Sequence, residues 1–299
     1  MEGAQAAFLP GGRRLHLHHG PIDLIVQAEG PGRSAALRRA AARFTTILQE
    51  LVGELDVLRL PVTWQGVWKR LAAKSCENDL ESVPHGVVAR RMYAAVSPFA
   101  PQFITPMAAV AGAVADEVLR AMGTDGLKRA WVNNGGDVAL FLAPGQCLRG
   151  AVADAPHGDL LILAASPVRG VASSGWRGRS HSLGIADTVT VLAASAARAD
   201  AAATMIANAV DLPGHRAIVR VPARELAPDS DLGERLVTVD VGPLGADEID
   251  AALGRGAEFA EICLKRGLIR AARLTLAGQS RVAGSPTSLT AFAKERCDA

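Results

Sequence analysis

The sequence predicts an α+β protein made of a duplicated α+β unit, with largely antiparallel sheets flanked by helices. Strand-like segments follow one another over residues 129–193, and helical periodicity is found mainly before and after them. No GxGxxG or Walker A sequence marks a doubly wound nucleotide-binding sheet. Two Ala-rich helical segments, 105–123 and 197–211, each lie beside a short strand, and this similarity indicates an internal repeat.

The N-terminal part begins with two expected strands over residues 13–30, joined by a turn at Gly20-Pro21. In the helix that follows, apolar residues recur at alternating spacings of four and three, so they share one face. Such a face belongs to a core helix or to a short dimerising coiled coil, and a homodimer therefore stays open. The residues of this face are Leu37, Ala41, Phe44, Leu48, Leu51, Leu55 and Leu58.

Residues that typically begin or end helices predict further elements. Thr105 and Pro106 are typical of the first positions of a helix, and Gly123 of its end. A loop is expected over 222–236, and a glycine interruption within the helix over 246–267. We expect one domain over residues 1–299, with a frayed tail at 285–299. Other expected helices span 86–99 and 197–211, and expected strands span 129–133, 137–143, 147–154, 160–165, 169–174, 187–193, 215–221 and 269–284.

Composition limits the class of protein. Hydrophobic residues make up 49% and charged residues 21%, which is typical of a soluble globular chain. The net charge of +2 favours neither nucleic acid nor an anionic membrane as a partner. The start of the chain lacks a signal-peptide pattern, and no uncharged apolar stretch approaches the roughly 20 residues that span a bilayer. We therefore expect a cytoplasmic protein.

The stretch "VNNGGDVAL", residues 132–140, is the first candidate for chemistry. A strand enters, two glycines permit a tight turn, and a second strand leaves. Backbone N–H groups in such a turn can bind an anion, and polar side chains lie at the same end. An ordinary hairpin turn would use the same residue types. The candidate ligand-binding residues here are Asn134, Gly135, Gly136 and Asp137.

A second candidate is the glycine-rich loop "SSGWRGRSHSLG", residues 173–184. Its two guanidinium groups could bind a phosphate, its indole could stack on a planar ring, and its imidazole could act as a base near neutral pH. A surface loop anchored by a Trp is the alternative. The candidate ligand-binding residues are Ser174, Gly175, Trp176, Arg177 and Arg179, and the candidate catalytic residue is His181.

The stretch "ADAAAT" offers a third candidate. Asp200 and Thr204 lie four residues apart on an expected helix and so face the same way. Two oxygen ligands suit Mg²⁺ or Ca²⁺ better than zinc. A helix-start carboxylate and a buried Thr would also explain the pair. Elsewhere, His16 and His18 would share a strand face, but two ligands make a weak metal site, and we interpret them as structural or surface groups.

The order of these pieces resembles the ApbE-type FAD:protein FMN transferases. A small-residue helix precedes "VNNGGD", which is followed by "SSG…H" and then by "VTVLA…ADAAAT". The chain is most similar to the soluble, uncharacterised branch of that superfamily, uncharacterised protein family 0280, over most of its length. The similarity to the transferases themselves covers roughly residues 105–212.

The resemblance implies a Mg²⁺-dependent, duplicated α+β fold that cleaves FAD and moves FMN onto a Thr of an acceptor protein. It implies that Asp200 and Thr204 hold the metal and that His181 is the base. The turn Gly135–Asp137 would lie beside the flavin. The helix carrying Gly112 and Asp116 would bind FAD.

The chain departs from the family pattern in four places. Ala111 replaces the family's Lys, Val110 replaces its metal-binding Ala, and the "DPxTG" loop and the N-terminal "MGT" motif are missing. Three functions therefore stay open. The first is flavin or nucleotidyl transfer with Mg²⁺ and FAD or another nucleotide-like ligand. The second is a different cofactor-biosynthesis reaction, such as a pterin-type one, and the third is non-catalytic ligand binding or assembly.

Overall fold

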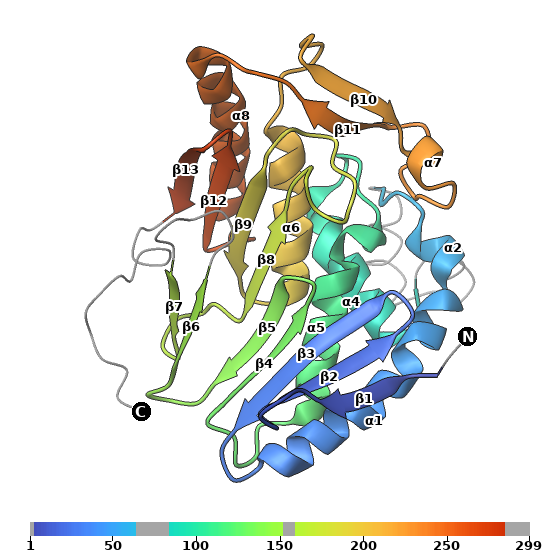
Figure 1. Ribbon diagram of the computed structural model, residues 1–299, viewed down its shortest axis with the longest axis vertical. Helices are drawn as coiled ribbons and strands as arrows, with labels where there is room; N and C mark the ends of the chain where they lie inside the picture. Colours follow the sequence, from blue (N-terminus) through green and yellow to red (C-terminus); the bar gives the residue numbers. More distant parts are fainter. Residues whose placement is uncertain (1–2, 64–83, 152–158, 285–299) are drawn as a thin grey trace, which may run out of the picture.

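A nine-stranded antiparallel sheet forms the centre of the protein (Figure 1). The structure is a computed structural model that describes residues 3–63, 84–151 and 159–284. Each strand pairs antiparallel with its neighbour in the order β1-β2-β3-β4-β5-β8-β9-β12-β13. The predicted α+β class with antiparallel sheets is confirmed. The strands are β1 Gln5–Phe8, β2 Arg14–His19, β3 Ile22–Glu29, β4 Arg129–Asn134, β5 Asp137–Leu142, β8 Gly170–Ser174, β9 Thr188–Ala193, β12 Ala271–Leu276 and β13 Gln279–Gly284.

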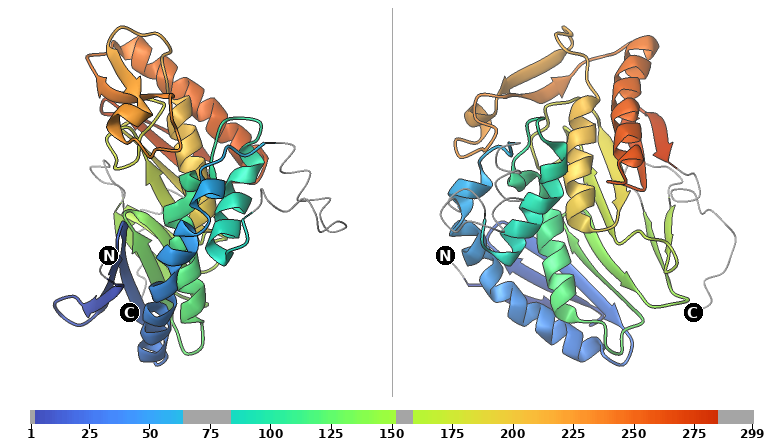
Figure 2. Two further views of the ribbon diagram at one scale, coloured as in Figure 1. Left: turned by 90° about the vertical axis from the view of Figure 1, so that its right-hand side faces the viewer. Right: turned by 180° about the vertical axis from the view of Figure 1, so that it is seen from behind.

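The long helices gather on one face of this sheet (Figure 2). They are α1 Arg33–Val52, α4 Val87–Val96, α5 Val110–Met122, α6 Ala196–Ala209 and α8 Ala246–Lys265. Two small hairpins lie outside the main sheet, β6 Cys147–Ala151 with β7 Asp159–Leu163, and β10 Ile218–Pro222 with β11 Leu236–Val241. The short elements are α2 Leu55–Leu58, α7 Ala223–Leu226 and the 3₁₀ turns η2 Ser97–Phe99 and η3 Pro106–Ala109.

The order of elements is that of a duplicated unit. In the first half the β2–β3 hairpin, α1, α5 and the β4–β5 hairpin follow one another, with α4 between the helices. In the second half the β8–β9 hairpin, α6, α8 and the β12–β13 hairpin do the same. Chain order therefore matches α6 with α1 and α5 with α8. The two Ala-rich helices, α5 and α6, are not equivalent members of the repeat but neighbours that contact each other.

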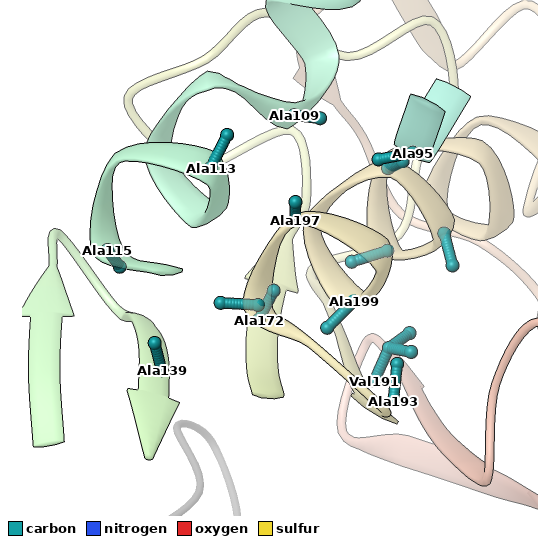
Figure 3. Packing of buried hydrophobic residues seen from close by; sticks show 14 of the residues in the cluster. Ala95, Ala109, Ala113, Ala115, Ala139, Ala172, Val191, Ala193, Ala197 and Ala199 are labelled. Carbon is teal, nitrogen blue, oxygen red and sulfur yellow. The ribbon is translucent and has the colours of Figure 1, made fainter. Parts of the chain in front are cut away.

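Small side chains let α5 and α6 approach closely. A Cβ atom at Gly112 would lie 2.4 Å from the carbonyl oxygen of Ala196. Figure 3 shows the buried residues Ala109, Ala113 and Ala197, which come from this pair of helical segments. Because Ala and Gly add little bulk, the two backbones can meet, and this contact positions residues of both helices for the site described below.

The predicted apolar face of residues 37–58 is used inside the chain. Leu37, Phe44 and Leu51 are buried, and Leu48 is packed against the same core. This arrangement is that of a core helix. Because this face is packed inside the chain, a homodimer would have to use another surface. The homodimer stays a prediction.

Some local expectations differ from the structure. The helical segment that starts at Pro106 begins with a 3₁₀ turn. The hydroxyl of Thr105 donates to Asp231 instead of capping the helix. Helix α8 runs without interruption, because Gly256 lies against Val210 and Leu274, where a Cβ would be 2.3 Å and 2.6 Å from their side chains. Strands β1 and β11 were not predicted, and the expected loop over 222–236 contains the short helix α7. The expected frayed tail, 285–299, lies outside the described residues. Among the residues that are described, no helix is long and apolar enough to span a bilayer.

Candidate functional site

A cavity of about 540 Å³ opens on the helix side of the sheet, between the β4–β5 turn, the end of β8, and helices α5 and α6. It brings together residues from all three sequence candidates. The loop between β10 and β11 supplies a further wall. Of the predicted residues, those that line the cavity are Asn134, Gly135, Asp137, Ser174, Gly175, Arg177, Arg179, His181, Asp200 and Thr204.

The β4–β5 turn needs its glycines. Gly135 and Gly136 have φ values of 66° and 116°, a region that side chains disfavour. The N–H of Gly136 donates to Asn133 Oδ1 at 2.8 Å, which closes the turn. The amide of Asn134 donates to the carbonyl oxygen of Ala111 at 3.1 Å, so the turn is tied to the first turn of α5.

Helix α6 presents a polar stripe to the cavity, because Asp200, Thr204 and Asn208 follow one another at a spacing of four. Asp200 Oδ2 accepts the backbone N–H of Gly112 at 3.0 Å. The carboxyl of Asp200 also hydrogen-bonds that of Asp137, whose Oδ1 accepts the N–H of Ser173 at 3.2 Å. The close approach of α5 and α6 thus holds two carboxyl groups against each other.

The acid–base state of this carboxyl pair is perturbed. Burial raises the pKa of Asp137 to about 7, although the N–H of Ser173, the contact with Asp200 and the charge of Arg179 act in the opposite direction. Burial, followed by the negative charge of Asp137, raises the pKa of Asp200 well above its usual range. The pair therefore holds a proton that a divalent cation could displace.

The two arginines of the 173–184 loop make different contacts. The guanidinium of Arg179 lies against the β4–β5 turn, where a Cβ at Gly135 would be 1.8 Å from its Nη2 atom. Arg177 pairs with Asp187 at 3.1 Å and lies over the ring of Trp176, 4.9 Å from its centroid. Trp176 also donates from its Nε1 to Asp187 and does not line the cavity. The geometry favours Arg179 over Trp176 as a ligand contact.

Three other predicted residues lie behind the cavity or at its edge. Gly112 makes the helix contact described above. The carboxylate of Asp116 accepts the backbone N–H groups of Ala196 and Ala197 at 3.0 Å each and so caps α6. Gly136 lies in the turn but is not among the cavity-lining residues. Gly112 and Asp116 thus position α6 and are not among the residues that line the cavity.

Sequence reasoning did not find all of the cavity. Asn208 accepts the N–H of Leu183 at 2.9 Å and so holds the loop next to His181. Its spacing of four from Thr204 could have revealed it. Asp231 enters from the β10–β11 loop and accepts from Thr105. No local pattern in that loop indicates a site.

Comparison with known proteins agrees with the resemblance. A family model described as "AbpE bacteria" matches residues 6–282. The chain belongs to this ApbE-like family. A UPF0280 protein of Methanothrix thermoacetophila is 37% identical over 178 residues, which are 58% of this chain and 65% of that protein. A UPF0280 protein of Methanopyrus kandleri is 36% identical over 216 residues, 68% of this chain and 79% of that one.

Solved structures show a weaker likeness to this ApbE-like chain. The apo flavinyl transferase ApbE of Pseudomonas stutzeri has 14% sequence identity and a TM-score of 0.47, covering 97% of this chain and 99% of that one. The ApbE protein of Thermotoga maritima has 12% identity and a TM-score of 0.43, with 95% and 97% covered. Because both TM-scores are below 0.5, these two structures do not indicate a function for this chain.

Proposed function

We propose that this chain binds a flavin nucleotide or a related nucleotide-like ligand together with Mg²⁺, and transfers FMN or a nucleotidyl group to an acceptor. The observation that carries the proposal is the contact between Asp137 and Asp200 in a cavity that also presents Arg179 and His181. A protein as the acceptor and a location in the cytoplasm belong to the same proposal.

The donor set fits Mg²⁺. Two carboxyl groups that hold a proton against each other form a place where a cation would replace the proton and leave both ionised. Mg²⁺ prefers such oxygen ligands, and the hydroxyl of Thr204 lies one helical turn from Asp200. The bound ion would supply charge neutralisation for a departing phosphate.

The remaining residues would orient the ligand and move a proton. Arg179, which lies against the β4–β5 turn, can bind phosphate oxygens. A volume of about 540 Å³ lies within the usual range of small-molecule sites. His181, held beside the cavity by the Asn208 contact, would take the proton of the acceptor hydroxyl.

One observation favours a non-catalytic binding protein instead. Ala111 lines the cavity at the place where the resemblance expects a Lys, so a positive charge for gripping the ligand is absent from that position. A different cofactor-biosynthesis reaction in the same cavity also stays open. These alternatives are separable by experiment, because each makes a different prediction for binding and for product.

The test is calorimetric titration of the purified protein with FAD, with and without Mg²⁺. We expect Mg²⁺ to strengthen binding, and Asp200→Asn to remove that effect. Asp240→Asn is the matched control, because Asp240 is exposed on β11. His181→Ala should keep binding but lose FMN transfer. Retained transfer in His181→Ala would refute its role as base, and absence of FAD binding in both conditions would refute the flavin proposal.

A further inference from the structure

A second group of metal-ligand side chains lies on the sheet face away from the helices. His16 and His18 are two residues apart on β2, and Asp23 is the partner of His18 on β3. Side chains alternate along a strand, and the neighbouring Leu15 and Leu17 are buried in the core beneath the helices. His16, His18 and Asp23 therefore point the other way, and their side chains are 34%, 45% and 47% exposed.

The donor atoms of these three residues converge. His16 Nε2 is 3.1 Å from Asp23 Oδ1, and His18 Nδ1 is 3.6 Å from Asp23 Oδ2. One donor atom from each residue lies within 4.8 Å of the other two. Bond lengths of roughly 2.0–2.2 Å in a tetrahedral zinc site place ligand atoms about 3.4 Å apart. The carboxylate is already at this separation from each imidazole, and rotation of an exposed ring would bring the imidazoles together.

The backbone beneath these residues is fixed on both sides. Strand β2 pairs with β3 along its whole length, and β1 pairs with β2 from Gln5 to Phe8. The Cα positions of the three ligands are therefore set before any ion binds, which reduces the entropy lost on binding. The sequence pattern identified only His16 and His18 as possible ligands at this place. The strand register adds Asp23 as the third.

We propose that His16, His18 and Asp23 form a site for a divalent transition-metal ion such as Zn²⁺, separate from the cavity. Two imidazole nitrogens and one carboxylate oxygen suit Zn²⁺, whereas Mg²⁺ prefers oxygen ligands alone. Three protein ligands leave a coordination position for water or another donor. Asp23 faces away from the helices. The next residue, Leu24, points to the opposite face of the sheet, where it is buried and pairs with Asn134, a residue of the cavity. The proposed site and the cavity are therefore separate.

Zinc titration of the untagged, full-length protein tests this proposal. Millimolar Mg²⁺ is kept present so that the oxygen ligands of the cavity are occupied. We expect one Zn²⁺ to bind per chain, and His18→Gln or Asp23→Asn to weaken that binding at least about tenfold, since even the loss of a residue that only hydrogen-bonds a metal ligand reaches this size. His215→Gln is the matched control, because His215 also contacts a carboxylate, Glu248, at 2.9 Å but has no third ligand within the part of the chain that the structure describes.

A second measurement separates binding from folding. Zn²⁺ should raise the melting temperature of the wild-type protein and of His215→Gln, but not of His18→Gln. Without zinc, His18→Gln should melt as the wild type does, because the side chain is exposed. Equal zinc affinity in the wild type and a His16→Gln/His18→Gln double variant would overturn the proposal. Loss of zinc binding only in Asp200→Asn would also overturn it, because the ion would then lie in the cavity.

Discussion

Replacing Glu117 by Gln should strongly destabilise the helix layer behind the cavity. Glu117 lies on α5, its side chain is fully buried, and its carboxylate contacts three guanidinium groups. Arg43 of α1 lies at 2.8 Å, Arg91 of α4 at 3.2 Å and Arg120 of α5 at 2.8 Å. One carboxylate thus joins three helices, and its loss removes a negative partner from all three guanidinium groups, leaving Arg43 with Glu50.

The magnitude follows from the pKa of Glu117. Burial alone would raise this pKa, but hydrogen bonds from Arg120 and Arg43 outweigh it and lower the pKa from 4.5 to about 2. At about 1.36 kcal/mol per pKa unit, this corresponds to roughly 3 kcal/mol of stability. Arg120 is 60% exposed, so solvent screening makes this an upper value.

The sign of the pH dependence follows from the lowered pKa. Because the folded-state pKa lies below that of the unfolded chain, the stabilisation is complete above about pH 4.5 and is lost as the pH falls toward 2. By pH 3, about 2 kcal/mol of it should be gone. The stability difference between the wild type and Glu117→Gln should therefore shrink between pH 7 and pH 3.

Urea unfolding of both proteins at pH 7 and pH 3 measures this difference. Glu258→Gln is the control, since Glu258 is an exposed carboxylate on α8 and should change stability little at either pH. A Glu117→Gln variant that is as stable as the wild type at pH 7 would refute the reasoning. So would a difference that is the same at both pH values.

Three further substitutions test the site. Gly112→Ala should destabilise the protein by about 1–3 kcal/mol in urea unfolding, because its Cβ would lie 2.4 Å from the carbonyl oxygen of Ala196; unchanged stability would contradict this close packing. Asn208→Ala should weaken ligand binding in calorimetry and leave Mg²⁺ binding intact, because it releases the loop at Leu183; equal ligand affinity would show that the loop needs no such anchor. Arg179→Gln should weaken FAD binding by at least about tenfold and reduce its salt dependence, because a charge-assisted contact is worth about 1.5–3 kcal/mol; an unchanged salt dependence would exclude Arg179 as a phosphate contact.

Local patterns predicted most of the fold. The apolar spacing over residues 37–58 identified α1 but extended it too far, since α1 ends at Val52 and residues 55–58 form α2; Gly123 marked the end of α5. Strand β11 was missed although Val237, Val239 and Val241 alternate with polar residues as in a strand; it pairs only with β10, outside the main sheet. The glycines of α8 were misread as an interruption, since a glycine that permits close packing and one that breaks a helix look alike in sequence.

The candidate site was predicted as separate pieces, and only the tertiary structure joins them. Asp137 was expected beside the ligand in a hairpin turn and Asp200 as a metal ligand on a helix, 63 residues further along the chain. Their contact depends on two features that no local signal carries. One is the N–H of Gly112, which reaches Asp200 only because α5 touches α6.

The other feature is the β5–β8 pairing, which brings the N–H of Ser173 to Asp137. If either were altered, the carboxyl groups would separate, and the negative charge of Asp137 would contribute less to the raised pKa of Asp200. The small residues of α5 and α6 therefore hold the two carboxyl groups together as well as pack the helices. A larger side chain at the helix contact should cost metal affinity even where the fold survives, and this link between Gly112 and Mg²⁺ binding connects the fold to the proposed function.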